Sequence, residues 1–253
     1  MQGQRVLITG ASSGIGRATA LALAQFGCHL FLLARREERL IELKKEILAS
    51  HPDLSVDLIL GDLNDPSTHQ KIETVTLGNV DILINNAGLA LGKERVQEAQ
   101  FSDWEIMLQT NVSANFRMVH LILPWMLKQG QGDIINLSSI AGHYTYQGGA
   151  VYCATKHAVN AFTKVLREET CGQNIRVMQM SPGLVDSEFS TVRFHGDKKM
   201  ADNVYVNMQP LMPEDVARLI SFMLIQPRHV VIDEMITTPL QQGSIHTVAR
   251  KGP

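Results

Sequence analysis

Apolar and polar positions alternate along the chain in two kinds of segment. Short apolar runs bounded by turn residues are typical of buried parallel strands, and they cover residues 5–9, 28–34, 56–60, 80–84, 133–137, 175–180 and 230–235. Segments with helical spacing separate them, at residues 15–26, 37–49, 66–77, 102–128, 151–171 and 213–225. Strands that alternate with helices form right-handed crossover units. The pattern therefore predicts an α/β fold of Rossmann type, a doubly wound, seven-stranded parallel sheet with helices on both faces.

One stretch does not follow this alternation. Residues 187–210 are too long for an ordinary connection, and a segment of this kind is usually a lid or a binding loop. No repeat, low-complexity segment or linker interrupts the chain. We therefore expect residues 1–253 to form a single dinucleotide-binding and catalytic domain, with residues 187–210 as its substrate loop.

Composition narrows the choice of partners. The 253 residues carry a formal net charge of −2, which leaves no basic excess to neutralise nucleic-acid phosphates. The apolar run in "MQGQRVLITG" is too short for a signal peptide, and no run approaches the roughly 18 residues of a membrane span. Three widely spaced cysteines without a CxxC indicate neither a disulfide framework nor a zinc site. We expect a soluble, cytoplasmic protein that binds small molecules and uses no metal, nucleic acid or membrane.

A glycine-rich turn follows the first predicted strand. The stretch "VLITGASSGIG" places Gly10, Gly14 and Gly16 in the spacing G-x-x-x-G-x-G. Glycines in such a turn let the backbone approach a pyrophosphate, which binds the free N–H groups at the start of the next helix. A glycine-rich turn also occurs without a ligand, but its place after the first strand favours a dinucleotide site.

The end of the second strand indicates which dinucleotide binds. A carboxylate there would bind the 2′-hydroxyl of NAD, whereas "LLARRE" has Arg35 and Arg36. A guanidinium can hold a 2′-phosphate through charge-assisted hydrogen bonds. We predict NADP rather than NAD, with Arg35 as the main contact and Arg36 as the secondary one, while one of the two is expected to be solvated.

Two later strand ends fit a cofactor that crosses the sheet. Asp62 in "LGDLND" is placed to accept a hydrogen bond from the adenine amino group. The stretch "INNAGLA" puts Asn85, Ala87 and Gly88 where a ribose would pass. Residues of these types are also common in turns. Their positions at the carboxyl ends of successive strands favour binding.

Tyr152 and Lys156 lie one helical turn apart in "VYCATKHAV". The i, i+4 spacing puts them on the same face of a helix. An unperturbed phenol titrates near pH 10, and a neighbouring positive charge favours the phenolate, so Lys156 is expected to lower the pKa of Tyr152. Tyr152 would then give a proton to a substrate oxygen or take one from it. The pair alone is a weak signal, because it can arise by chance.

Ordered motifs give the chain its resemblance to the short-chain dehydrogenase/reductase family: "TGASSGIG", "NNAG", "TNVSANF", "NLSSIAG", "YCATK" and "MSPGLV". The resemblance implies a catalytic tetrad of Asn111, Ser139, Tyr152 and Lys156. In that tetrad Ser139 holds the substrate oxygen and Asn111 anchors a water that relays protons. The implied cofactor contacts are Gly10, Ser12, Ser13, Gly14, Ile15, Gly16, Arg35, Arg36, Asp62, Leu63, Asn85, Ala87, Gly88, Tyr152, Lys156, Pro182, Gly183, Val185 and Ser187. The family also implies a homo-oligomer, either a tetramer or a dimer.

Two polar residues near the tetrad are less informative. His143 follows Ser139 closely and either lines the pocket or faces solvent. Cys153 shares the catalytic helix and is expected to be buried filler.

The substrate is indicated by a closer resemblance. The stretches "NNAGLALG", "SPGLVDSEFSTVRFHGD" and "LMPEDVARLISFML" resemble the NADP-dependent 3-hydroxy acid dehydrogenase branch, which oxidises serine, allo-threonine and related short acids. We therefore expect Ser139 and Tyr152 to bind the substrate hydroxyl. Arg193, the only arginine in residues 187–210, either binds the substrate carboxylate or pairs with an acid such as Glu188 or Asp197.

Other functions remain open at this point. A 3-oxoacyl thioester reductase or a broad carbonyl reductase would use the same tetrad. A catalytically silent NADP-binding sensor is an alternative of another class. The sensor is disfavoured because it would need no Tyr152 and Lys156 together.

Overall fold

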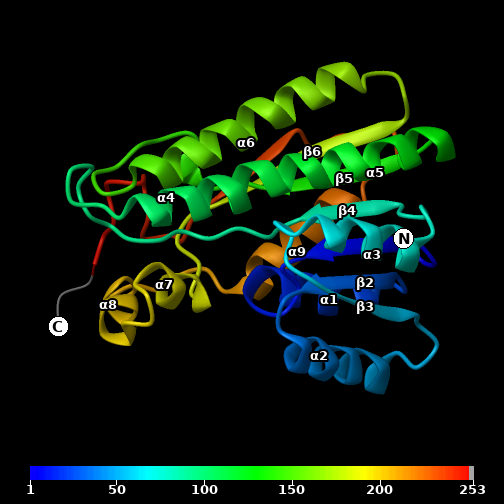
Figure 1. The fold of residues 1–253 in the computed structure, drawn as a ribbon, viewed down its shortest axis with the longest axis horizontal. Helices are drawn as coiled ribbons and strands as arrows, with labels where there is room; N and C mark the ends of the chain where they lie inside the picture. Colours follow the sequence, from blue (N-terminus) through cyan, green and yellow to red (C-terminus); the bar gives the residue numbers. More distant parts are fainter. Residues whose placement is uncertain (251–253) are drawn as a thin grey trace.

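A seven-stranded sheet forms the centre of the computed structural model, which describes residues 1–250 (Figure 1). The strands pair in parallel in the order β3-β2-β1-β4-β5-β6-β7. Their bounds are Arg5–Thr9 (β1), His29–Ala34 (β2), Val56–Leu60 (β3), Ile82–Asn85 (β4), Gly132–Leu137 (β5), Ile175–Pro182 (β6) and Glu234–Thr237 (β7). The predicted doubly wound fold is confirmed. Because β1 pairs with both β2 and β4, the strand order reverses there, and ligands of open α/β sheets bind beyond the carboxyl ends of such strands.

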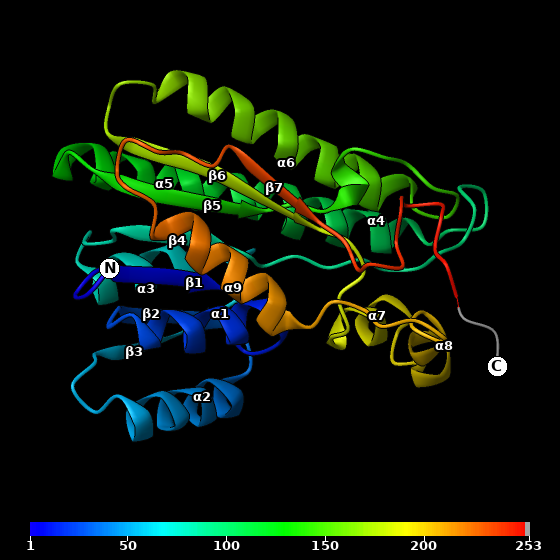
Figure 2. The same ribbon diagram turned by 180° about the vertical axis from the view of Figure 1, so that it is seen from behind.

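Helices cover both faces of the sheet (Figures 1 and 2). The helices of one face are α1 (Gly14–Gln25), α2 (Glu37–Ser50) and α9 (Pro213–Leu224), and those of the other are α3 (Pro66–Thr76), α5 (Asn115–Gln129) and α6 (Ala150–Glu169). Successive strand residues point to opposite faces. In β1, Val6 and Ile8 join the first apolar core, whereas Leu7 joins the second. The sheet therefore separates two apolar cores.

The helix predicted over residues 102–128 is interrupted near its middle. It consists of α4 (Phe101–Leu108), a π-helical turn η1 (Gln109–Ala114) and α5. The π-helical turn contains Asn111. Such turns are rare and frequently occur at functional sites, so the interruption marks the position that the sequence assigned to the tetrad.

The last strand lies further along the chain than predicted. Residues 230–235 form the apolar run, but β7 begins at Glu234 and ends at Thr237. This strand is at the edge of the sheet and, within residues 1–250, pairs only with β6. An edge strand is less completely buried than a central one, so its sequence lacks the continuous apolar signal that located the others.

The segment predicted as a substrate loop is more regular than the sequence suggested. Residues 187–210 contain two short helices, α7 (Glu188–Arg193) and α8 (Lys198–Asn203). Both views show these helices together at one end of the molecule, beyond the carboxyl ends of β6 and β7 (Figures 1 and 2). Among residues 1–250, no helix combines the length and the apolar character needed to cross a membrane.

A buried ion pair joins two central strands at the end of the sheet opposite to α7. Asp133 of β5 accepts hydrogen bonds from Arg176 of β6, with Nε–Oδ1 and Nη2–Oδ2 distances of 2.8 and 2.7 Å. Their exposed fractions are 1% for Asp133 and 5% for Arg176. Arg228 also donates to Asp133. The pair connects β5 to β6 away from the predicted site.

Candidate active site

A cavity of about 370 Å³ lies beyond the carboxyl ends of the central strands. It runs from the glycine-rich turn, past the end of β4, to α6 and the start of the substrate loop. The predicted site residues that line it are Gly10, Ser12, Ser13, Gly14, Ile15, Arg35, Arg36, Asp62, Leu63, Ala87, Gly88, Ser139, Tyr152, Lys156, Pro182, Gly183, Val185 and Ser187. One continuous crevice thus contains most residues that the sequence assigned to cofactor and catalysis.

Two predicted cofactor contacts do not line this cavity. A Cβ atom on Gly16 would lie 2.4 Å from the Gly10 carbonyl oxygen, so this glycine permits close packing of α1 on the turn. The Asn85 side chain is buried and donates to the Asn115 carbonyl and to Asn136, at 2.9 and 3.2 Å. Its prediction as a cofactor contact is therefore wrong for the side chain, and the neighbouring Asn86 lines the cavity instead.

The two arginines after β2 point in different directions. Arg35 is 70% exposed at its side chain and makes one long contact of 3.4 Å with Asp62. Arg36 lies across the glycine-rich turn and donates to Ser12 Oγ at 3.2 Å and to Ser13 Oγ at 2.6 Å. The geometry therefore gives Arg36 the more fixed position, in contrast to the predicted ranking.

Helix α6 brings Tyr152 and Lys156 to the bottom of the crevice. The Lys156 ammonium lies 5.9 Å from the centre of the Tyr152 ring and donates to the Leu137 carbonyl at 2.9 Å. Only 6% of Lys156 is exposed, and burial lowers its pKa to about 8. A buried lysine with a lowered pKa can exchange protons near neutrality.

The Tyr152 phenol is also desolvated. Burial raises the pKa of Tyr152 above its ordinary value, and the neighbouring Ser139 hydroxyl offsets only part of this effect. In the chain by itself the pKa of Tyr152 is therefore raised and not lowered as expected, because desolvation of the phenol dominates. A further positive charge at the site would be needed to favour the phenolate.

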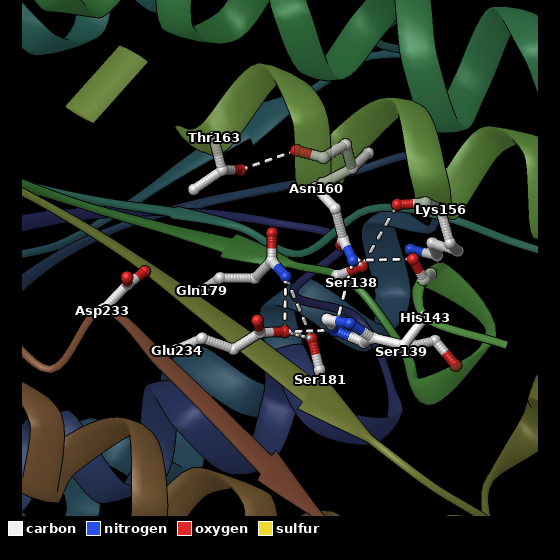
Figure 3. Close-up of polar contacts among 12 residues, drawn as sticks. Ser138, Ser139, His143, Lys156, Asn160, Thr163, Gln179, Ser181, Asp233 and Glu234 are labelled. Carbon is white, nitrogen blue, oxygen red and sulfur yellow. Dashed lines mark hydrogen bonds and ion pairs between the residues drawn. The ribbon is translucent and has the colours of Figure 1, made fainter. Parts of the chain in front are cut away.

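Ser139 and its neighbour Ser138 are held by separate sets of contacts. The Ser139 hydroxyl accepts from the Ala141 N–H at 3.1 Å and lies 3.4 Å from the Pro182 carbonyl oxygen, at the edge of the crevice. Ser138 also lines the crevice, but its hydroxyl donates to Asn160 of α6 (Figure 3). This arrangement fixes the strand end and leaves Ser139 facing the site.

His143 does not line the cavity, and only 22% of its side chain is exposed to solvent. Its Nε2 atom lies 2.5 Å from a carboxylate oxygen of Glu234. Figure 3 shows Gln179 and Ser181 converging on the same oxygen, each at 2.6 Å. Burial raises the pKa of Glu234, but the hydrogen bonds from Ser181, Gln179 and His143 outweigh that effect and keep it below its usual value. The cluster supports the Ser139 segment from β7.

The Asn111 side chain bonds to the Leu89 backbone, and its Nδ2 also donates to the Thr155 hydroxyl at 3.2 Å. Its Oδ1 accepts from the Leu89 N–H at 2.8 Å, and its Nδ2 donates to the Leu89 carbonyl at 2.7 Å. A Cβ atom on Gly88 would lie 3.2 Å from Asn111 Oδ1 and 3.5 Å from Lys156 Nζ, so Asn111 and Lys156 approach the same point. The structure therefore places Asn111 beside Lys156, with its side chain held by Leu89 and Thr155.

Arg193 lies outside the cavity lining. Its guanidinium donates to the Gly92 carbonyl at 3.1 Å, to the Tyr146 hydroxyl at 2.9 Å and to the Gly148 carbonyl at 3.4 Å. It pairs with neither of the acids considered for it. Three of its five N–H groups are therefore engaged by the loops around it, and the guanidinium is held away from the cavity lining.

Several residues of the crevice escaped sequence reasoning. Phe189 of α7 meets the Tyr152 ring edge-on, with ring centres 5.6 Å apart. Glu188 lines the crevice and binds Arg36. The sequence pointed to Phe189 and Glu188 only through their position in residues 187–210, the segment predicted to cover the site. Cys153 is buried, as expected.

Comparisons with known proteins agree over almost the whole chain. The family model described as short chain dehydrogenase matches residues 4–198. An NADP-dependent 3-hydroxy acid dehydrogenase of Schizosaccharomyces pombe is 45% identical over 99% of this chain and 98% of the relative. A serine 3-dehydrogenase of Agrobacterium fabrum is 35% identical over 94% of each chain. A solved closed form of serine dehydrogenase complexed with NADP+ superposes with a TM-score of 0.91 and 36% identity, covering 98% of this chain and 100% of that chain.

Proposed function

The chain belongs to the short-chain dehydrogenase/reductase family, and on that premise we propose that it is an NADP-dependent dehydrogenase of short 3-hydroxy acids. The observation that carries the proposal is the single crevice in which Tyr152, Lys156 and Ser139 face the glycine-rich turn. The relatives named for NADP, 3-hydroxy acids and serine support the same choice. The reaction transfers a hydride between the cofactor and the carbon that bears the 3-hydroxyl group.

The residues of the crevice suit NADP. Gly10 and Gly14 adopt positive φ values of 67° and 51°, which favour glycine and leave the backbone open to a pyrophosphate. Arg36 is fixed beside Ser12 and Ser13, where it can meet a 2′-phosphate. When bound, the nicotinamide supplies or accepts the hydride.

The chain's own residues control the proton. Ser139 orients the substrate oxygen, and Tyr152 donates a proton to it in reduction or removes one in oxidation. Lys156 contributes the positive charge next to the phenol and, with a pKa of about 8, can take up a proton again near neutral pH. Asn111, which lies beside Lys156, is proposed to hold the water that returns this proton to solvent. Phe189 closes the far side of the Tyr152 ring and restricts access of bulk water.

The assembly and location of the protein are also proposals. Residues 1–253 are taken as one catalytic domain, and a homo-oligomer, tetramer or dimer, is supported by exposed apolar side chains at one edge of the sheet. Phe222 of α9 and Ile225, which follows the last residue of α9, are each 49% exposed, and Ile236 of β7 is 52% exposed. A cytoplasmic location is supported by three free cysteines.

A substrate panel with a catalytic variant tests the proposed function. The wild type should oxidise serine, allo-threonine and 3-hydroxybutyrate with NADP in preference to NAD, measured as kcat/KM. Tyr152→Phe should lower turnover by about 10²–10⁴-fold, because the general acid–base is lost. The control Tyr144→Phe alters an exposed tyrosine and should leave turnover unchanged.

Each alternative function gives a different result. A preference for 3-oxobutyryl thioesters or uncharged ketones would replace the hydroxy acid assignment. Binding of NADP with no turnover on any substrate would support a sensor. Near-normal turnover by Tyr152→Phe would contradict the mechanism.

A further inference from the structure

Glu188 links the substrate loop to the arginines beside the glycine-rich turn. One carboxylate oxygen accepts from Arg36 Nη1 at 2.7 Å, and the other accepts from Arg39 Nη1 at 2.5 Å. The other two nitrogens of Arg36 donate to Ser12 and Ser13. Every nitrogen of this guanidinium is therefore engaged, and the Glu188 carboxylate occupies one side of it.

The position of Glu188 within the crevice is what makes this contact informative. Glu188, Arg36 and Ser13 all line the cavity that contains the glycine-rich turn. Two guanidiniums that converge on one carboxylate offer the donor pattern that also binds a phosphate monoester. The Nη1–H group that donates to Glu188 cannot donate to a phosphate oxygen at the same time.

We propose that Glu188 is a specificity-determining residue that competes with the 2′-phosphate of NADP for Arg36 and Arg39 and is displaced when the phosphate binds. This inference rests on the proposed function, because it assumes that the crevice takes NADP. NAD has no 2′-phosphate and leaves Glu188 in place. The Glu188 carboxylate thus weakens the binding of NADP and leaves the binding of NAD unchanged.

Charge supports displacement rather than sharing. A phosphate monoester carries about −1.5 to −2 charges at neutral pH. Burial raises the pKa of Glu188, but hydrogen bonds from Arg36 and Arg39 outweigh it and leave the pKa below its usual value, so Glu188 is an anion as well. Two anions beside the same guanidiniums repel each other. All three side chains are partly exposed, which makes the ion pairs weak enough to exchange.

Displacement of Glu188 would also affect contacts near Tyr152, at the catalytic end of the crevice. The residue before Glu188 is Ser187, whose Cβ lies 3.5 Å from the position of a Cβ built on Gly14. The residue after it is Phe189, which packs edge-on against Tyr152. When Glu188 leaves Arg36 and Arg39, the first turn of α7 loses this attachment. That turn lies between the Ser187 contact with the glycine-rich turn and the Phe189 contact with Tyr152.

Equilibrium binding to the full chain tests the proposal. We compare Kd values for NADPH and NADH by cofactor fluorescence in the wild type, in Glu188→Gln and in the control Glu214→Gln, which alters an exposed glutamate in the first turn of α9. Glu188→Gln should tighten NADPH binding by about three- to thirtyfold, the range expected for releasing two exposed ion pairs. NADH binding should change less than about twofold. The gain should shrink in high salt, because the competition is between charges.

Adenine nucleotides that lack the nicotinamide half of the cofactor test the effect of the 2′-phosphate by itself. Competition by 2′,5′-ADP should strengthen in Glu188→Gln, whereas competition by 5′-AMP should not. Weaker NADPH binding in Glu188→Gln would overturn the proposal and make Glu188 a support for Arg36. An equal change for NADPH and NADH, or none for either, would overturn it as well.

The failure of this inference is separable from failure of the proposed function. If the wild type prefers NADPH and oxidises 3-hydroxy acids while Glu188→Gln fails to tighten NADPH binding, only the competition is refuted. If the wild type prefers NADH, both are refuted.

Discussion

Replacing Lys156 by methionine should abolish turnover and make the protein more stable. The lysine is buried, and its ammonium has one hydrogen bond, to the Leu137 carbonyl at 2.9 Å. Methionine has a similar unbranched length and carries no charge into the interior. The variant therefore removes an unfavourable desolvation that the active site requires.

The magnitude follows from the pKa of Lys156. Burial lowers it from 10.5 to about 8, and each unit corresponds to about 1.4 kcal/mol, which gives an unfavourable term of about 3 kcal/mol. Loss of the bond to Leu137 offsets about 1 kcal/mol. Methionine should thus raise the free energy of unfolding at pH 7 by about 2 kcal/mol, or the melting temperature by about 4–8 °C.

The pH dependence has a definite sign. Because the folded state has the lower pKa, it releases the proton first, and the unfolded chain keeps it up to its own pKa of 10.5. The desolvation term is therefore full below pH 8 and fades as the pH rises toward 10.5. The advantage of the methionine variant should shrink by about 1 kcal/mol between pH 7 and pH 9.

Urea unfolding at several pH values, at fixed protein concentration and without added cofactor, measures these differences. Lys164→Met is the matched control, because Lys164 lies on the same helix and is exposed. A Lys156→Met protein that is less stable than the wild type at pH 7, or an advantage that does not change between pH 7 and pH 9, would refute the reasoning.

Two further predictions concern residues at opposite ends of the sheet. Asp133→Asn should lower the free energy of unfolding by about 3–5 kcal/mol in urea titrations, because it leaves the buried Arg176 without its carboxylate. The control Asp215→Asn, which alters the more exposed ion pair with Arg218, should lose less than about 1 kcal/mol. Equal losses in the two variants would contradict the prediction. Arg193→Ala should lower kcat/KM by about 10–100-fold for 3-hydroxy acids and for uncharged alcohols alike, because Arg193 holds the loop through Tyr146 and two backbone carbonyls. A loss confined to carboxylate-bearing substrates would instead assign Arg193 to substrate binding.

Local sequence predicted those parts of the site that depend on one element. The glycine-rich turn follows from the residues beside β1, and the shared face of Tyr152 and Lys156 follows from helical spacing. The fold followed from apolar periodicity, except at β7, where an edge strand lacks that signal. Asn85 and Asn86 illustrate a finer limit. Neighbouring residues at a strand end point to opposite sides, and the amino-acid sequence alone does not say which of the two asparagines faces the ligand.

Contacts between segments far apart in the sequence account for the remaining differences between the predicted and the observed site. Glu188 meets Arg36 across 152 positions, and His143 meets Glu234 across 91, so no local pattern could pair them. The pKa of Tyr152 depends on how completely the fold excludes water from the phenol, and residue spacing carries no information about that. Arg193 was assigned by charge, whereas its partners are a tyrosine hydroxyl and backbone carbonyls.

The division of the interior by the sheet has a consequence for how such a chain evolves. Ile220 of α9 belongs to one apolar core and Ile122 of α5 to the other, with the strands between them. Substitutions at sites that share no neighbours have nearly additive effects on stability. The two helical layers can therefore change sequence almost without epistasis between them. Constraint falls instead on the strands, where Leu7 and Ile8 are adjacent in the chain and belong to different cores.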